Sequence, residues 1–149
     1  MNRAPNPAYP GHHHFLPYLI NRVTSFLNVE FQKVLDGYGL TLTHWRVLAF
    51  LAEQDGLSVS ALADATVTEQ STLSRALMNL ENRGYIKREP SPEDNRSVNI
   101  FLVPEGRAVF DLVLMRALTI EAAALEGIPA VELETLRKVL LRIASNLRP

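Results

Sequence analysis

The chain contains no cysteine, and this absence removes several kinds of chemistry at once. There are no disulfides, no thiolate ligands for a metal and no thiol-based redox switch within the chain. No stretch approaches the roughly 18 to 20 apolar residues that a membrane span needs. The first residues, MNRAPNPAYPGHHH, are rich in proline and lack the apolar centre of a signal peptide. We therefore expect a cytoplasmic protein.

The sequence also lacks the motifs of common enzyme sites. It has no glycine-rich phosphate loop, no Gly-x-Ser-x-Gly and no closely spaced pair of carboxylates in an apolar setting. Asp64 is more simply interpreted as a solvated residue, and Glu69 as a first-turn acid that the helix dipole favours. We do not expect an enzyme.

Net positive charge is missing as well, because the formal net charge is −1. Affinity for DNA depends largely on phosphate neutralisation by lysine and arginine, so this balance does not by itself indicate a nucleic-acid partner. From Ser71 to Ile100 the basic residues number five and the acidic residues four. They are Arg75, Arg83, Lys87, Arg88 and Arg96 against Glu81, Glu89, Glu93 and Asp94. Any indication of DNA binding must come from the order of the structural elements.

What is present is the composition of an ordinary globular domain, with 149 residues, 47% apolar and 21% charged. The first dozen residues are predicted to be a loose arm. Apolar residues then recur at helical spacing between Phe15 and Asp36. Gly37 and Gly39 follow, and glycine commonly ends a helix in the left-handed conformation. The apolar positions of this helix are Leu16, Leu19, Ile20, Val23, Phe26, Leu27, Phe31, Val34 and Leu35.

Three further helices are predicted before the first strand. The second is expected to begin after Thr43 as N-cap and to run to about Gln54. After an Asp55-Gly56 turn, Ser58 is expected to cap a short helix over residues 59–65, and Thr68 a longer one over residues 69–82. The longer helix has an apolar face formed by Leu73, Ala76, Leu77 and Leu80.

The hydrophobic period then changes from helix to strand. Residues 85–89 and 97–102 are rich in β-forming side chains, and the second run alternates Val98, Ile100 and Leu102 toward one face. The polar loop 90–96 connects them, which predicts a hairpin with a long tip. Pro104 suits the first turn of a helix over residues 105–125, and Pro129 opens a final helix ending near Leu147. The predicted class is mainly α with a small β-hairpin.

Two short helices joined by a tight turn, with the second followed by a β-hairpin, make a winged helix-turn-helix. The second helix of such a motif fits the DNA major groove and presents side chains to base edges. The hairpin, or wing, lies beside it, along the backbone or in the adjacent minor groove. The order of elements therefore predicts double-stranded DNA as the partner.

The residues within this motif resemble those of the multiple-antibiotic-resistance-regulator (MarR) family. Residues 62–89 read LADATVTEQSTLSRALMNLENRGYIKRE, and residues 90–106 read PSPEDNRSVNIFLVPEG. The family pattern has a leucine-alanine helix, a Ser-Arg recognition helix, an LExxG end (here Leu80 to Gly84) and a wing carrying Asp-x-Arg. The upstream segments Gly39-Leu40-Thr41 and Trp45-Arg46-Val47-Leu48 also resemble the family. The similarity covers about residues 16–147.

The resemblance implies which residues contact DNA. Arg75 would read a guanine, because guanidinium bonds bidentately to O6 and N7. Arg96 would enter an A/T-rich minor groove, whose negative potential favours arginine, with Asp94 orienting it. Asn95 stands where many relatives have a basic residue, and Val103 stands where many have threonine. The residues expected on the exposed side of the recognition helix are Gln70, Ser71, Thr72, Ser74 and Arg75.

The final helix carries an apolar stripe that predicts association with a partner helix. Its members are spaced by three and four residues, which is the rhythm of a helix–helix seam. They are Leu133, Leu136, Leu140, Ile143 and Leu147. The resemblance implies a single domain over 1–149, with a helical dimerisation region at 1–36 and 104–149 and a DNA-binding lobe at 40–103. The resemblance implies that the homodimer acts as a repressor on a near-palindrome with half-sites roughly 10 bp apart.

The resemblance also implies a small aromatic or phenolic acid as effector. The candidate residues are Arg22, His44, Trp45 and Arg46, because arginine or histidine beside an aromatic ring suits a carboxylate. The alternative is that Trp45 belongs to the core and that His44 and Arg46 are capping or surface residues.

Two alternative functions remain open at this point. One is a winged-helix protein-interaction module without DNA binding, which the weak basic balance allows. The other is a metal-sensing regulator, suggested by the run His12 to His14 and by His44. Tetrahedral zinc needs about four donors, yet the helix after the wing has no histidine and the chain has no cysteine. A flexible arm that supplies the only other histidines is a poor preorganised site, so we expect no metal.

Overall fold

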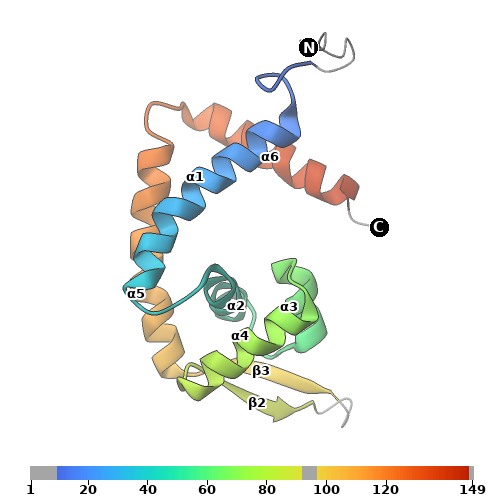
Figure 1. The fold of residues 1–149 in the computed structure, drawn as a ribbon, viewed down its shortest axis with the longest axis vertical. Helices are drawn as coiled ribbons and strands as arrows, with labels where there is room; N and C mark the ends of the chain where they lie inside the picture. Colours follow the sequence, from blue (N-terminus) through green and yellow to red (C-terminus); the bar gives the residue numbers. More distant parts are fainter. Residues whose placement is uncertain (1–9, 92–96, 148–149) are drawn as a thin grey trace, which may run out of the picture.

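The computed structural model describes residues 10–91 and 97–147. A lower lobe contains α2, α3, α4 and the strands, and α5 leads from it to an upper helical region with α1 and α6 (Figure 1). No helix among the described residues is both long and apolar enough to span a membrane. The structure confirms the predicted class, mainly α with a small antiparallel sheet.

The order of elements agrees with the prediction except for one short additional strand. Four helices precede the hairpin, and two follow it. The elements are α1 (Leu16–Asp36), α2 (Leu42–Glu53), β1 (Leu57–Ser58), α3 (Val59–Thr66), α4 (Gln70–Asn82), β2 (Ile86–Pro90), β3 (Val98–Leu102), α5 (Pro104–Ala124) and α6 (Ala130–Leu147).

The turn between α1 and α2 corrects two of the sequence predictions. Gly37 is the C-cap of α1 but is right-handed, with φ −62°, whereas Gly39 has φ +62° and makes the left-handed turn. The N-cap of α2 is Thr41, not Thr43, and its hydroxyl accepts from the His44 N–H at 3.2 Å. The Thr41 N–H in turn donates to His44 Nδ1 at 3.2 Å, completing a capping box. The cap therefore lies two residues earlier than predicted.

The sheet has three antiparallel strands in the order β1-β3-β2. The hairpin β2–β3 was predicted, but β1 was not, because two residues are too few for a period to be visible. Leu57 pairs with Ile100 and Ser58 with Asn99. Asp55 and Gly56 anchor this strand: the Asp55 carboxylate accepts from the Leu102 N–H at 2.8 Å, and the Gly56 N–H donates to the Ile100 carbonyl at 3.0 Å.

The core lies between α2, α3, α4 and the sheet, with the end of α1 and the first half of α5 packed against it. Removal of this apolar surface from water is the main stabilising contribution to the lobe. Among the described residues, the buried apolar side chains are Leu35, Leu40, Val47, Leu48, Leu51, Leu62, Leu73, Ala76, Leu77, Leu80, Ile86, Ile100, Phe110 and Val113.

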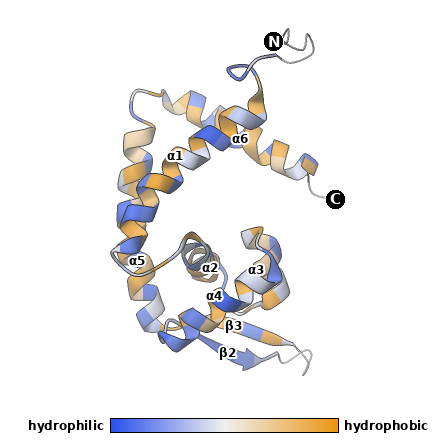
Figure 2. Cartoon of the chain, viewed as in Figure 1, coloured by the Kyte–Doolittle hydropathy of each residue, from blue (hydrophilic) through white to orange (hydrophobic). Residues whose placement is uncertain are grey.

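The upper helical region differs, because much of its apolar surface faces solvent. Helix α6 has no buried residue, and hydrophobic residues, drawn in orange, recur along α1, α5 and α6 (Figure 2). Leu141 is 71% exposed, Met115 66% and Phe26 62%. Among the described residues, nothing covers the apolar side of α6.

Candidate nucleic-acid interface

Helices α3 and α4 are joined by a tight turn at residues 67–69. Ser58 caps α3 as predicted, its hydroxyl accepting from the Ala61 N–H at 3.1 Å. Val67 is left-handed, with φ 50° and ψ 49°, a conformation that costs an L-residue roughly 1–2 kcal/mol. The prediction that Thr68 caps α4 is wrong, because its hydroxyl instead donates to the Thr66 carbonyl at 3.1 Å. The N-cap is Glu69, whose side chain makes no capping bond.

Helix α4 separates an apolar face from a polar one. Leu73, Ala76, Leu77 and Leu80 are buried against the lobe, as the sequence predicted. The Ser74 hydroxyl donates to the Gln70 carbonyl at 2.8 Å, so it is already engaged within the helix. The side chains expected to face DNA are all exposed, namely Gln70, Ser71, Thr72, Ser74 and Arg75. The structure therefore presents the polar face of α4 to an external partner.

The wing continues directly from α4. Strands β2 and β3 pair from Ile86 with Leu102 to Pro90 with Val98, and the Ser91 N–H donates to the Ser97 carbonyl at 2.9 Å. The wing-tip candidates Asp94 and Arg96 lie outside the described residues. The base of the wing lies beside the end of α4.

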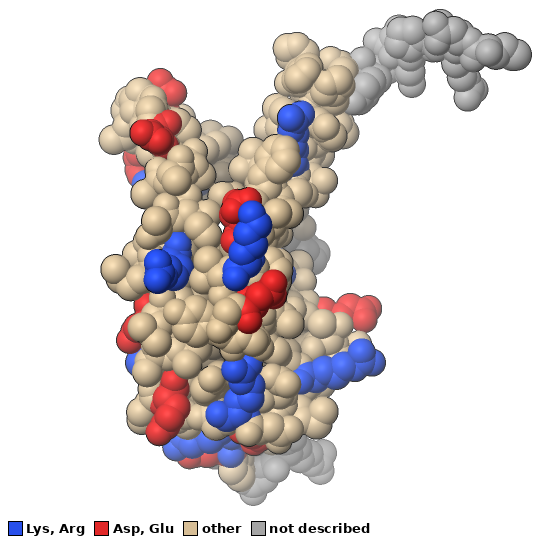
Figure 3. All heavy atoms as spheres, turned by 60° about the vertical axis from the view of Figure 1, so that its left-hand side comes forward, with Lys and Arg blue, Asp and Glu red and all other residues tan. Residues whose placement is uncertain are grey.

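The basic residues near α4 have different environments. Lys87 pairs with Glu89 at 2.6 Å and Arg88 with Glu81 at 2.9 Å, so β2 presents paired charge. Arg75 makes no ion pair with any described residue. Figure 3 shows basic and acidic side chains interspersed over one face, without a single extended basic patch. The free charge of the recognition helix is thus concentrated at Arg75.

Arg83 performs a structural role that the sequence analysis did not assign. Its guanidinium donates to the Gly39 carbonyl at 2.6 Å and to the Tyr38 carbonyl at 2.7 Å, and it lies 4.8 Å from the centre of the Tyr85 ring. The end of α4 is thereby tied to the α1–α2 turn. Partners 44 and 45 residues away leave no local pattern, so sequence inspection had no signal for this contact.

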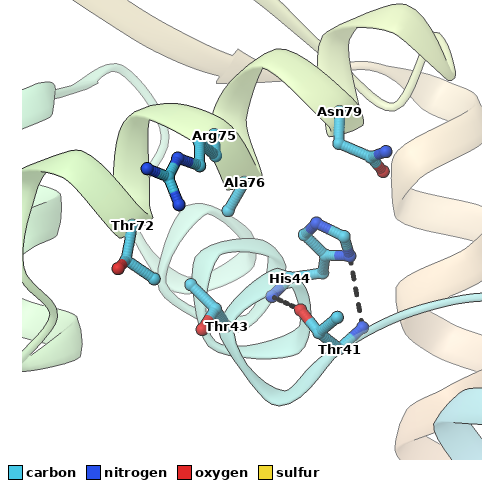
Figure 4. A pocket seen from close by; sticks show the side chains of 7 residues that line it. All are labelled: Thr41, Thr43, His44, Thr72, Arg75, Ala76 and Asn79. Carbon is cyan, nitrogen blue, oxygen red and sulfur yellow. Dashed lines mark hydrogen bonds between the residues drawn. The ribbon is translucent and has the colours of Figure 1, made fainter.

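A pocket of about 360 Å³ lies between the start of α2 and the polar side of α4 (Figure 4). His44 lines it from α2, and Thr72, Arg75 and Asn79 line it from α4. Burial and, secondarily, the nearby positive charge of Arg83 lower the pKa of His44 below its usual 6.5. His44 is therefore neutral at pH 7. The Thr41-x-x-His44 spacing of a capping box was the sequence signal that could have placed this side chain.

The structure places the effector candidates in different surroundings. Trp45 is half-buried, stacked on Phe110 with 5.1 Å between ring centres and edge-on to Phe31 at 5.2 Å. Arg46 and Arg22 are exposed, and Arg22 lies 5.4 Å from the centre of the Phe26 ring. His44 faces the α2–α4 pocket. The four side chains do not converge on one site within a single chain.

Comparisons with known proteins agree with this geometry. Residues 38–97 match the model of the MarR family. The chain is 35% identical over 103 residues to the HTH-type transcriptional regulator PapX of Escherichia coli, an alignment covering 68% of this chain and 63% of PapX. The match thus spans just under two thirds of that relative.

Solved structures extend the similarity to nearly the whole chain. The crystal structure of a MarR family transcriptional regulator from Silicibacter pomeroyi is 33% identical, covers 97% of both chains and gives a TM-score of 0.88. CouR from Rhodococcus jostii RHA1, solved with p-coumaroyl-CoA, shares the fold at 24% identity, with a TM-score of 0.83 and coverage of 95% of this chain and 99% of CouR. With its winged helix-turn-helix and this extent of similarity, the chain belongs to the MarR family of transcriptional regulators.

Proposed function

We propose that the protein is a homodimeric, ligand-responsive repressor that places α4 in the major groove of near-palindromic operator DNA. The observation that carries this proposal is the two-sided character of α4. Its apolar face holds it rigidly on the core, while its polar face, including the unpaired Arg75, is exposed beside a wing. A rigid helix with free donors at one face is what direct readout of base edges requires.

Within this interface Arg75 is the proposed base reader. It lies on the outward side of α4 and has no carboxylate partner among the described residues, so its guanidinium is available to a guanine. Gln70, Ser71, Thr72 and Ser74 surround it on the same side. Arg96, oriented by Asp94, is proposed to enter the adjacent minor groove from the wing tip.

Dimerisation is proposed to cover the exposed apolar surface of α1, α5 and α6. An apolar groove of about 330 Å³ lies between α1 and α5, lined by Phe26, Leu27 and Ile120 among others. The α6 stripe is equally exposed, with Leu136 at 48% and Leu140 at 40%. A second copy would bury both surfaces through a two-fold interface and set the spacing of the two recognition helices.

We propose a small aromatic acid as the effector. This proposal rests on the aromatic cluster of Trp45, Phe31 and Phe110, which joins α1, α2 and α5 where the helical region meets the lobe. Arg46 follows Trp45 on α2, whereas Arg22 lies farther from the cluster, nine residues before Phe31 on α1. A second subunit would bring further side chains toward the junction. Ligand binding there would change the angle between the two regions and hence the spacing of the recognition helices.

Operator binding is tested with DNA from beside the protein's own gene. Fluorescence anisotropy across a salt series should show log affinity falling linearly and steeply with log salt, through counterion release. No affinity for any DNA at low salt would contradict the proposal and favour the protein-interaction module. Affinity that changed with zinc and was reversed by a chelator would favour the metal-sensing alternative.

A further inference from the structure

The pocket between α2 and α4 is surrounded by hydrogen-bond donors. Thr41, Thr43 and His44 come from the first turn of α2, and Thr72, Arg75 and Asn79 from the polar side of α4 (Figure 4). No carboxylate lines it. The first-turn N–H groups of a helix have no partner within the helix, and they carry the positive end of its dipole. The lining therefore favours an anion.

His44 gives this pocket a directed donor. The Thr41 N–H donates to Nδ1 at 3.2 Å, so Nδ1 is unprotonated and the neutral ring carries its proton on Nε2. His44 is only 7% exposed, yet no described residue accepts from Nε2–H. In Figure 4 the second ring nitrogen faces α4, across the pocket from Thr41. No buried side-chain nitrogen or oxygen among the described residues lacks a hydrogen-bond partner, so solvent reaches this N–H through the pocket. It can therefore donate to an acceptor that enters the pocket.

The surrounding charge supports the same conclusion. Arg75 lines the pocket and makes no ion pair with any described residue, and the Arg83 guanidinium is close enough to His44 to lower its pKa. One cation in the lining, a second cation near His44 and a helix N-terminus together favour negative charge in the pocket. An oxyanion there would accept from Nε2–H, while the guanidinium of Arg75 stays available to a base.

We propose that this pocket seats a phosphate group of the DNA backbone at the edge of the major groove that α4 enters. The inference rests on the proposed function, because Thr72 and Arg75 belong both to the pocket wall and to the proposed base-reading face. A helix lying in the major groove is flanked by backbone phosphates, and the start of α2 stands on one flank of α4. The seated phosphate fixes the depth and register of α4, and His44 is a phosphate contact rather than an effector ligand.

Two variants of His44 separate this role from its part in the α2 cap. Glutamine and glutamate both complete a capping box after threonine, so His44→Gln and His44→Glu should fold with unchanged circular dichroism. Glutamine retains an N–H donor, whereas glutamate only accepts and repels phosphate. Gln54→Glu, at the opposite end of α2, adds the same charge away from the pocket and serves as the control.

Operator affinity should fall at least tenfold for His44→Glu and less than threefold for His44→Gln and Gln54→Glu. The slope of log affinity against log salt should also become shallower for His44→Glu, because the added carboxylate lowers the positive charge that the protein brings to the DNA. If His44→Glu binds with the affinity and salt slope of the wild type, the phosphate seat is wrong while DNA binding stands. An equal loss for Gln54→Glu would also overturn it, since the effect would then be general repulsion.

A second measurement does not depend on DNA. Titration of the wild-type protein with inorganic phosphate, followed by the ¹⁵N shift of His44 Nε2, should show saturable binding that Thr43→Val weakens. If the wild type binds no DNA, the proposed function fails, and this titration still tests the pocket. No shift with either phosphate or operator DNA would overturn the site. A shift with phosphate but none with operator DNA would overturn the assignment to the DNA backbone.

Discussion

The DNA-binding lobe buries its apolar side chains, whereas the helical region leaves many of them exposed. In the lobe of residues 40–103, the inward side chains of α2, α3, α4 and the sheet are buried, and Leu48, Leu62 and Leu80 are fully inaccessible. In α6 an equally regular apolar stripe has no buried member. Both regions follow helical periodicity, yet among the described residues only the lobe buries the apolar side of its helices in a continuous core. The apolar stripe of α6 stays exposed to solvent.

The joint between the two regions, where α5 begins beside the α4–β2 junction, is closely packed. Gly106, in the first turn of α5, packs so closely on the α4–β2 junction that a methyl group there would overlap the Tyr85 carbonyl. Arg83 ties the same junction to the end of α1. A change in the angle of α5 or in the α1–α2 turn would therefore act directly on the junction that follows α4.

The largest expected effect comes from disrupting the α6 stripe. The double variant Leu136→Glu/Leu140→Glu places like charges across the proposed two-fold seam, where burying them unpaired is costly. We expect a monomer that has lost operator binding, and truncation after Gly127 should do the same or cause aggregation. Sedimentation velocity should show the wild type at about 33 kDa, twice the 16.7 kDa of one chain. A wild-type protein sedimenting as a monomer at micromolar concentration would rule out the dimer.

The second prediction tests whether the lobe is a complete core. Leu77→Ala should lower the free energy of unfolding by about 2–5 kcal/mol, because it opens a cavity at a buried position. The neighbouring Met78 is 55% exposed, and Met78→Ala should change stability by less than about 0.5 kcal/mol. Urea denaturation in the Leu136→Glu/Leu140→Glu background should give the same difference. A cost that depends on the dimer would show that the lobe is not independent.

The third prediction concerns the joint. Gly106→Ala should destabilise the protein by about 1–3 kcal/mol, because the added methyl group must push α5 away from the Tyr85 backbone. Thermal unfolding measures the effect. Gly84→Ala is an informative comparison, since a methyl group there meets open space and the cost arises only from its φ of 67°. Equal stability of Gly106→Ala and wild type would mean that the joint is loose.

The fourth prediction concerns DNA contacts rather than stability. Arg75→Ala should weaken operator binding by about 1–3 kcal/mol and relax the preference for one G·C pair, with unfolding unchanged. Arg96→Ala should cost most on sites with A/T-rich flanks. Anisotropy with matched operator variants measures both. Unchanged affinity for both variants would show that the roles implied by the family do not hold for this chain.

The smallest expected effect is a pH dependence that originates at His44. Its pKa is lowered in the folded chain, so below about pH 6.5 the unfolded chain takes up a proton that the folded chain resists. Stability should therefore be greatest above pH 6.5 and fall toward the lower folded-state pKa. Urea unfolding between pH 5 and 8, with His44→Gln subtracted, isolates this contribution. A difference that increased as the pH fell would reverse the sign and contradict the burial argument.

Much of the fold followed from local pattern alone. The 3.6-residue period of α1 and α4, the alternation of Val98 and Ile100, and Pro104 at the start of α5 each depend on residues close together in the chain. The same local order carried the resemblance to the MarR family and hence the expected DNA-facing side of α4. The roles of Arg75 and of the wing residues Asp94 and Arg96 remain predictions from that order.

Long-range contacts decided the rest. Strand β1 exists because Leu57 pairs with Ile100, and a strand of two residues is too short to show an alternating pattern in the sequence. The backbone path decides that Thr41 rather than Thr43 caps α2, and that α4 follows Glu69 without a cap from Thr68. The local sequence does not determine this path. Arg83 reaches Tyr38 and Gly39, and His44 faces α4, because packing of the lobe brings distant segments together. Periodicity determined which side of each helix is apolar, whereas only the tertiary structure determined what each polar side chain meets.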